Sequence, residues 1–131
     1  MNAAVRYYSR SGNTKALAEA IAEAAGVPAI SVDSSEAPIR ESADILFIGG
    51  ALYAYGIDSH LKEYLQTLSG DKVKKAVVFS TSWLSKHAVD LIKKQLREKG
   101  ISTAEDYFYA KNKPNEAQLK EAAAFAAKFL Q

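Results

Sequence analysis

One stretch decides the fold of this 131-residue chain: Tyr7-Tyr8-Ser9-Arg10-Ser11-Gly12-Asn13-Thr14-Lys15. The apolar run 3–8 predicts a strand, and the alanine-rich run 16–25 predicts a helix. A sharp turn from strand to helix leaves the first helical N–H groups without partners, and the positive end of the helix dipole points at whatever occupies the turn. Short hydroxyl and amide side chains add further donors. The stretch therefore predicts an anion site, most simply for a phosphate.

Length and composition indicate an ordinary globular protein. A chain of 131 residues suits one domain with a sizeable core, and 48% hydrophobic with 24% charged residues is typical of soluble proteins. The absence of cysteine excludes disulfides, thiolate metal sites and cysteine nucleophiles. The two histidines, His60 and His87, are too few and too scattered to predict a zinc site, so we expect no metal.

Charge and hydropathy exclude several kinds of partner. The formal net charge is +2, and the lysines at 72–75 and 93–94 are expected on a solvated surface rather than in a nucleic-acid interface. No apolar run approaches the ~18 residues that predict a membrane span, and the N-terminus lacks a signal-peptide pattern. We therefore expect a cytoplasmic protein, without nucleic acid and without a membrane span.

Beyond the first helix, short apolar strands alternate with amphipathic helices. Strands are predicted at 27–32, 44–50, 75–80 and 106–110, and residues 33–43 are predicted to form a loop or at most one helical turn. Asp58 or Ser59 is expected to cap a helix that Gly70 ends, and Asn115 to cap the last helix. A further helix, stopped by Gly100, is predicted around 89–96. This alternation favours an α/β fold with a mainly parallel, five-stranded sheet.

In such sheets a ligand binds beyond the carboxyl ends of the strands. Three predicted loops meet that condition: 9–14, 50–58 and 80–86. The first is built for an anion, and the other two carry the flat apolar rings of Tyr53, Tyr55 and Trp83. A phosphate site beside aromatic rings predicts a phosphorylated planar ligand, such as flavin mononucleotide (FMN) or another nucleotide.

At these residues the chain resembles the flavodoxin family. The family's N-terminal pattern is matched over 5–14 and at Ala18 and Ile21, with one departure: Arg6 stands where an apolar or aromatic residue is usual. Segment 48–56 looks like the second flavin loop of the family, and 79–83 falls where its third loop belongs. The resemblance implies one flavodoxin-like domain over residues 1–131. It also implies a three-layer, doubly wound α/β fold with strand order 2-1-3-4-5, and FMN as cofactor.

The resemblance also implies roles for individual residues. Hydroxyl and amide side chains of the first loop would hydrogen-bond the phosphate, together with the N–H groups of residues 10–14, while Gly12 lets the backbone approach closely. Arg10 and Lys15 lie nearby and are expected to face solvent. An ordinary helix cap is the alternative reading of the same residues. The expected phosphate ligands are Ser9, Ser11, Asn13 and Thr14.

The two later loops would hold the flavin ring. Tyr53 and Tyr55 are candidates to stack on or flank it, Trp83 to cover its other face, and Gly56 to allow a peptide flip. Ordinary packing is the alternative for each aromatic residue. The backbone N–H groups of 80–82 would reach the pyrimidine edge. The predicted cofactor-binding set is Ser9, Arg10, Ser11, Gly12, Asn13, Thr14, Ala51, Leu52, Tyr53, Tyr55, Gly56, Ser80, Thr81, Ser82 and Trp83.

The functional prediction is an FMN-binding electron-transfer protein that moves one electron at a time between a reductase and an acceptor, as a monomer or weak dimer. It needs no catalytic side chain. An FMN-dependent oxidoreductase acting on a quinone or a porphyrinogen is the alternative, although the chain has little spare length for a substrate pocket. A flavodoxin-like domain that has lost FMN also stays open. A phosphoacceptor regulatory domain is disfavoured because Gly49-Gly50, not an aspartate, ends the third strand.

Overall fold

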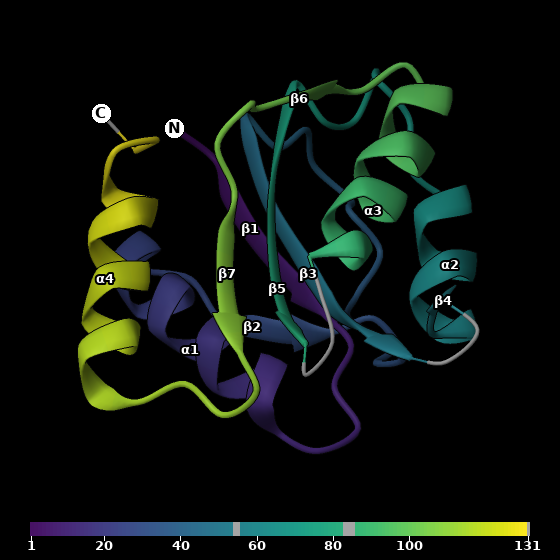
Figure 1. Cartoon of the computed structure of the whole chain (residues 1–131). Coiled ribbons are helices and arrows are strands. Elements are labelled where there is room, and N and C mark those ends of the chain that lie inside the picture. The colour runs from purple at the N-terminus through teal and green to yellow at the C-terminus, as the bar shows by residue number, and fades with distance from the viewer. Residues whose placement is uncertain (54–55, 83–85, 131) are drawn as a thin grey trace.

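The computed structural model describes residues 1–53, 56–82 and 86–130. In this part of the chain, helices lie on both faces of one seven-stranded sheet (Figure 1). The strands are β1 (Ala3–Tyr7), β2 (Ala29–Ser31), β3 (Ile45–Tyr53), β4 (Gly56–Ile57), β5 (Lys75–Ser82), β6 (Ser102–Thr103) and β7 (Phe108–Lys111). The helices are α1 (Asn13–Ala25), α2 (Ser59–Gln66), α3 (His87–Glu98) and α4 (Glu116–Ala127).

The strand order confirms the predicted doubly wound α/β topology. The sheet runs β2-β1-β3-β5 in parallel register, and the fifth position is shared by β6 and β7, both parallel to β5. This corresponds to the expected order 2-1-3-4-5. The sheet has two more strands than the five predicted, because the last strand is split in two and β4 forms an additional antiparallel pair with β3. Gly56, the first residue of β4, has φ +115, a conformation that favours glycine.

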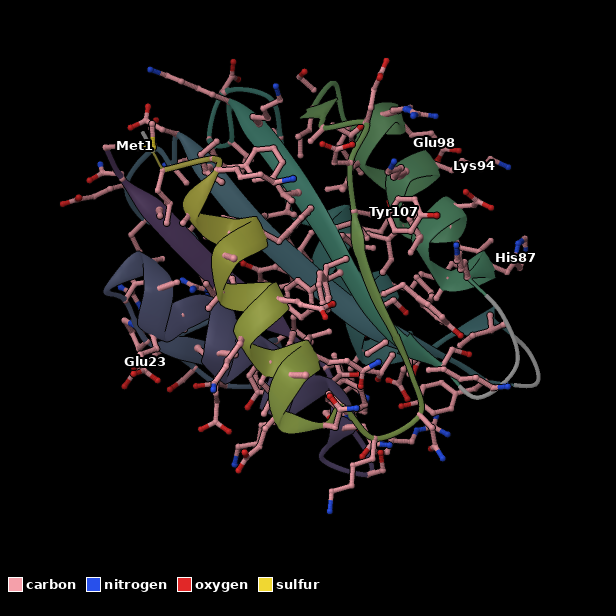
Figure 2. The ribbon with its side chains drawn as sticks, turned by 60° about the vertical axis from the view of Figure 1, so that its left-hand side comes forward. Met1, Glu23, His87, Lys94, Glu98 and Tyr107 are labelled. Atoms are coloured by element: carbon pink, nitrogen blue, oxygen red, sulfur yellow. The ribbon has the colours of Figure 1, made fainter. Side chains whose placement is uncertain are left out.

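Helices α1 and α4 cover one face of the sheet, and α2 and α3 cover the other (Figure 1). The central strands are buried on both faces, as their unbroken apolar runs predict. In β3, Phe47 packs with the α1/α4 core, whereas Leu46 and Ile48 pack with the α2/α3 core. Figure 2 shows Lys94 and Glu98 projecting from the outer surface of α3, opposite its buried stripe.

Gly49 and Gly50, two adjacent residues of β3, let β5 and α2 pack closely against this strand. A Cβ atom on Gly49 would overlap the Phe79 ring, and one on Gly50 would overlap the Leu61 side chain. Gly49 therefore leaves room for β5 and Gly50 leaves room for α2. The close packing follows from the absence of side chains at these positions, since core packing leaves no free volume.

Arg6, the residue that departs from the family pattern, is buried in β1 on the α2/α3 face. Its Nε donates to the Ala37 carbonyl at 2.7 Å and its Nη1 to the Val5 carbonyl at 3.1 Å. The Tyr64 hydroxyl donates to the same Ala37 carbonyl at 2.7 Å. Residues 33–42 contain no helix or strand and cross this part of the sheet, with Ala37 packed in the core. Arg6 thus holds segment 33–42 against the sheet by a hydrogen bond to Ala37. This segment takes the place of a crossover helix between β2 and β3.

We predict that Arg6→Ala lowers the free energy of unfolding by about 2–3 kcal/mol, because it removes two charged hydrogen bonds and leaves a cavity. Arg6→Lys recovers only part of this loss, since one ammonium lacks the planar fork that reaches both carbonyls. Urea unfolding measures both. Arg40→Ala, an exposed change in the same segment, is the control and stays within about 0.5 kcal/mol of the parent. An Arg6→Ala protein as stable as the parent would contradict the assigned role.

Candidate cofactor site

The turn between β1 and α1 has the geometry of an anion site. Gly12 is the N-cap of α1 with φ +95, a left-handed conformation that favours glycine. Gly12, at the N-cap position, has no side chain to cap the first turn of α1. Ser9 Oγ accepts from the Gly12 N–H at 3.0 Å, and Ser11 Oγ from the Asn13 N–H at 3.4 Å. The start of the helix is thus left open to a ligand, as at other phosphate-binding helix N-termini.

Thr14 links this turn to the end of β5. It is 1% exposed, and its hydroxyl lies 2.5 Å from the Thr81 hydroxyl, which is 2% exposed. Each hydroxyl has one proton, so the bond leaves lone pairs and one O–H for a further partner. The contact fixes the start of α1 against the neighbouring strand end.

The three predicted segments meet at one cavity. Its volume is about 270 Å³, and it lies beyond the carboxyl ends of β1, β3, β5 and β7, at the lower edge of the sheet in Figure 1. The predicted residues that line it are Ser9, Arg10, Ser11, Asn13, Thr14, Ala51, Leu52, Tyr53, Thr81 and Ser82. A sheet edge thus brings together side chains more than 70 residues apart in sequence.

The other residues predicted to bind the cofactor do not line the cavity or lie outside the residues that the structure describes. Ser80 is fully buried, and its hydroxyl donates to the Gly50 carbonyl at 2.7 Å, so it ties β5 to β3. Gly12 and Gly56 shape the backbone at φ +95 and +115 without lining the cavity. Tyr55 and Trp83 lie outside the described residues.

Residues 51–53 and 81–82 belong to strands, not to the loops expected there. β3 continues to Tyr53 because Leu52 pairs with Ile57 of β4, and β5 continues to Ser82 because it pairs with β7. The cavity wall at these positions is therefore rigid sheet. A strand edge presents side chains in fixed alternation, so Leu52 and Tyr53 are held in place before any ligand binds.

Sequence reasoning missed Asn112 as a lining residue. It follows β7 with φ +62, and its N–H donates to the Ser82 carbonyl at 3.1 Å. Asparagine tolerates this conformation better than most residues. Its place one residue after a strand, at the edge where ligands bind, was the available signal.

A charged network stands beside the phosphate turn. Arg10 Nε and Nη2 donate to Asp58 Oδ2 at 3.0 and 2.5 Å, and the guanidinium carbon lies 3.9 Å from the centroid of the Tyr53 ring. Asp58 Oδ1 accepts from the His60 backbone N–H at 2.7 Å, which confirms Asp58 as the N-cap of α2. The His60 ring adds a contact of 2.9 Å to the same oxygen and stacks on Tyr8. Arg10 was expected to face solvent, but its charged end is engaged with Asp58.

Burial and hydrogen bonding act on this network in opposite directions. Burial by itself raises the pKa of Asp58, but hydrogen bonds from the His60 N–H and from Arg10 outweigh it and hold the pKa below its usual range. Burial raises the pKa of the Tyr53 phenol, and the Arg10 guanidinium and backbone N–H only partly offset that rise. Near neutral pH the site therefore contains an ionised Asp58, a neutral Tyr53 and a positive Arg10.

The residues fit a phosphorylated flavin. A phosphate at the start of α1 would meet backbone N–H groups and the neutral donors Ser9, Ser11, Asn13 and Thr14, while the strand ends with Leu52 and Tyr53 supply an apolar wall. The fold and the cavity together define a class: an α/β protein whose cavity at the carboxyl edge of the sheet fits a phosphate and a planar ring.

Comparison with known families makes the class specific. The model of the flavodoxin domain matches residues 4–126, and the chain belongs to the flavodoxin family. FMN is the cofactor that membership implies, and the chain is an electron-transfer flavoprotein of the FMN type. The comparison with curated proteins gave no significant match.

Solved structures agree in fold. A flavodoxin from the domain Archaea is 27% identical with a TM-score of 0.79, and the match covers 99% of this chain and 96% of that one. Flavodoxin 1 of Bacillus cereus is 24% identical with a TM-score of 0.80, and the match covers 99% of this chain and 97% of that one. At this identity the likeness supports the fold alone. A flavodiiron core from Synechocystis is 27% identical with a TM-score of 0.81 over all of this chain but 35% of that one.

Two features are absent from the described residues. Within 1–53, 56–82 and 86–130, no helix has the length and apolar character to cross a membrane. In the same residues, no group of three or more histidines, aspartates or glutamates is placed to hold a metal ion.

We predict that Ser11→Ala with Thr14→Ala weakens FMN binding on the order of a hundredfold, because each hydroxyl lost from a charged phosphate costs about 1.5 kcal/mol or more. Riboflavin, which lacks the phosphate, should bind nearly as before. Fluorescence titration measures both. Ser42→Ala with Thr67→Ala removes the same two hydroxyl types elsewhere and is the control. Equal loss of both ligands in the first variant would argue against the phosphate role.

Asp58 also predicts a pH dependence of stability. Its folded pKa lies below the unfolded value of about 3.9, so its contribution is fully present above that pH and is lost as pH falls toward the folded pKa. The difference in unfolding free energy between the parent and Asp58→Asn should be constant from about pH 5 to 7 and should shrink below about pH 4. Urea unfolding across this range tests it. A difference that grows on acidification would show the opposite sign of shift.

Proposed function

We propose that the protein is a flavodoxin-type electron carrier that holds FMN in the cavity at the carboxyl edge of the sheet and passes single electrons between a reductase and an acceptor. One observation carries the proposal: the open start of α1 and the wall formed by Leu52 and Tyr53 line the same cavity. The phosphate and the planar ring of one ligand require that combination.

The chain's own residues bind and orient the cofactor. Ser9, Ser11, Asn13 and Thr14 hold the phosphate with the N–H groups at the start of α1, and the Thr14–Thr81 contact keeps that start fixed. Leu52 and Tyr53 exclude water from one side of the ring. Bound FMN supplies the one-electron chemistry, and the protein tunes it by packing, hydrogen bonds and charge.

The character of the lining favours a carrier over a stand-alone oxidoreductase. In the described lining of the cavity, the ionisable side chains are Arg10 and Tyr53. Arginine stays protonated and the pKa of Tyr53 is raised, so neither exchanges a proton readily near neutral pH. An enzyme that oxidises a porphyrinogen or reduces a quinone moves protons as well as electrons, and these residues offer no general acid or base for that step.

We further propose that residues 1–131 form one flavodoxin-like domain, that it works in the cytoplasm as a monomer or weak dimer, and that both redox partners are proteins. The expected contributions of Gly12, Gly56, Tyr55, Ser80 and Trp83 to flavin binding stay predictions.

The test is binding followed by electron transfer. We expect added FMN to be quenched at one-to-one stoichiometry, and the photoreduced holoprotein to be reoxidised by a one-electron acceptor such as ferricyanide. Purified holoprotein mixed with NADPH and a quinone should show no steady turnover. Absence of FMN binding would refute the proposal, whereas sustained quinone reduction by the protein alone would favour the oxidoreductase alternative.

A further inference from the structure

We infer that Asp58 is a positioning residue: it holds the Arg10 guanidinium against Tyr53 and cancels its charge, so that Arg10 does not act as a ligand of the cofactor phosphate. This inference rests on the proposed FMN site. Arg10 lies in the middle of the phosphate turn, between Ser9 and Ser11, where an unengaged guanidinium would be the strongest anion ligand available. The orientation of the Arg10 side chain therefore determines whether a charged group binds the phosphate.

The geometry fixes that direction from both sides. Two guanidinium nitrogens donate to one carboxylate oxygen of Asp58, at 3.0 and 2.5 Å, and the guanidinium carbon lies 3.9 Å from the Tyr53 ring centroid. The Asp58 side chain is 5% exposed and the Arg10 side chain 44%. A nearly buried carboxylate thus holds a half-exposed arginine, and a ring supports the planar group from the other side.

Asp58 cannot turn away from this contact. Its second oxygen accepts from the His60 N–H at 2.7 Å as the cap of α2 and also contacts the His60 ring, which in turn stacks on Tyr8. Both carboxylate oxygens are therefore committed, one to the helix start and one to Arg10. The ion pair joins the turn after β1 to the start of α2, two segments separated by 48 residues.

The arrangement has two consequences for the cofactor. The positive charge of Arg10 is cancelled by Asp58 before a phosphate arrives, so the subsite carries little net charge of its own. One face of the Tyr53 ring, which lines the cavity, is covered by the guanidinium. Arg10 thus shapes the wall of the cavity instead of serving as a phosphate ligand.

The experiment compares the FMN and riboflavin affinities of Arg10→Gln, Asp58→Asn and the double variant. Asparagine caps helices as well as aspartate does, so Asp58→Asn keeps the start of α2 and removes only the charge. The ratio of riboflavin Kd to FMN Kd reports the phosphate alone. The probes are free FMN and free riboflavin, titrated by fluorescence at low and high salt.

We expect Asp58→Asn to raise that ratio by about three- to tenfold, because the released Arg10 charge then attracts the phosphate across a partly exposed site. Arg10→Gln should lower the ratio by a similar factor, since the Asp58 carboxylate next to the phosphate turn is then left uncompensated. The double variant should return to within about twofold of the parent, because both charges are gone. All these changes should shrink at high salt.

Other outcomes would overturn the inference. If Arg10 binds the phosphate directly, the double variant stays as weak for FMN as Arg10→Gln. If Asp58 acts only as a helix cap, Asp58→Asn leaves the ratio at the parent value. Asp44→Asn is the matched control: it breaks another ion pair, that of Asp44 with Lys74 at 3.2 Å, just before the start of β3. The nine-residue strand β3, about 30 Å long, separates Asp44 from Tyr53 at the site. Asp44→Asn should therefore leave the ratio of the two Kd values unchanged.

A second readout needs no cofactor and separates this inference from the proposed function. In urea unfolding of the apoprotein, the effects of Arg10→Gln and Asp58→Asn on the unfolding equilibrium constant should be coupled by about threefold or more. Independent effects would show that the ion pair does not form in solution. If FMN fails to bind while the coupling is present, the proposed function falls and the contact between Arg10 and Asp58 stands.

Discussion

The site depends on one constraint, the parallel pairing of β1, β3 and β5. Parallel strands end at the same edge, so the turn before α1 and the ends of β3 and β5 meet there although they are far apart in sequence. Gly49 and Gly50 allow the approach of β5 and α2 that this edge requires. The bond between Thr14 and Thr81 then fixes the helix start against the strand end. The cavity follows from these contacts together.

Two arginines of β1 and its following turn show how one residue type serves two environments. Arg6 is buried and fastens the crossover segment through carbonyl oxygens, without a carboxylate within ion-pair distance among the described residues. Arg10 is half exposed and is neutralised by Asp58. In the first case hydrogen bonds compensate the buried charge, and in the second an ion pair does. The Arg10 charge beside the phosphate turn is therefore already balanced.

Sequence patterns predicted much of this fold because they report local physics. Unbroken apolar runs identified the central strands, and aspartate or asparagine before a helix identified Asp58 and Asn115 as N-caps, both confirmed. The split of the last strand and the β3–β4 pair were missed, since such short strands carry no period of their own. The lining residues Ser9, Ser11, Thr14 and Tyr53 came from the pattern, whereas Asn112 depended on where β7 ends.

The sequence by itself determined that a strand turns into a helix within residues 7–15, that hydroxyl groups surround that turn, and that the core is a parallel sheet. These properties depend on residue type and spacing over a few positions. Only the tertiary structure decided that Arg10 lies on Tyr53 and is held by Asp58. The direction of a long charged side chain is set by partners distant in sequence, and no local pattern contains that information.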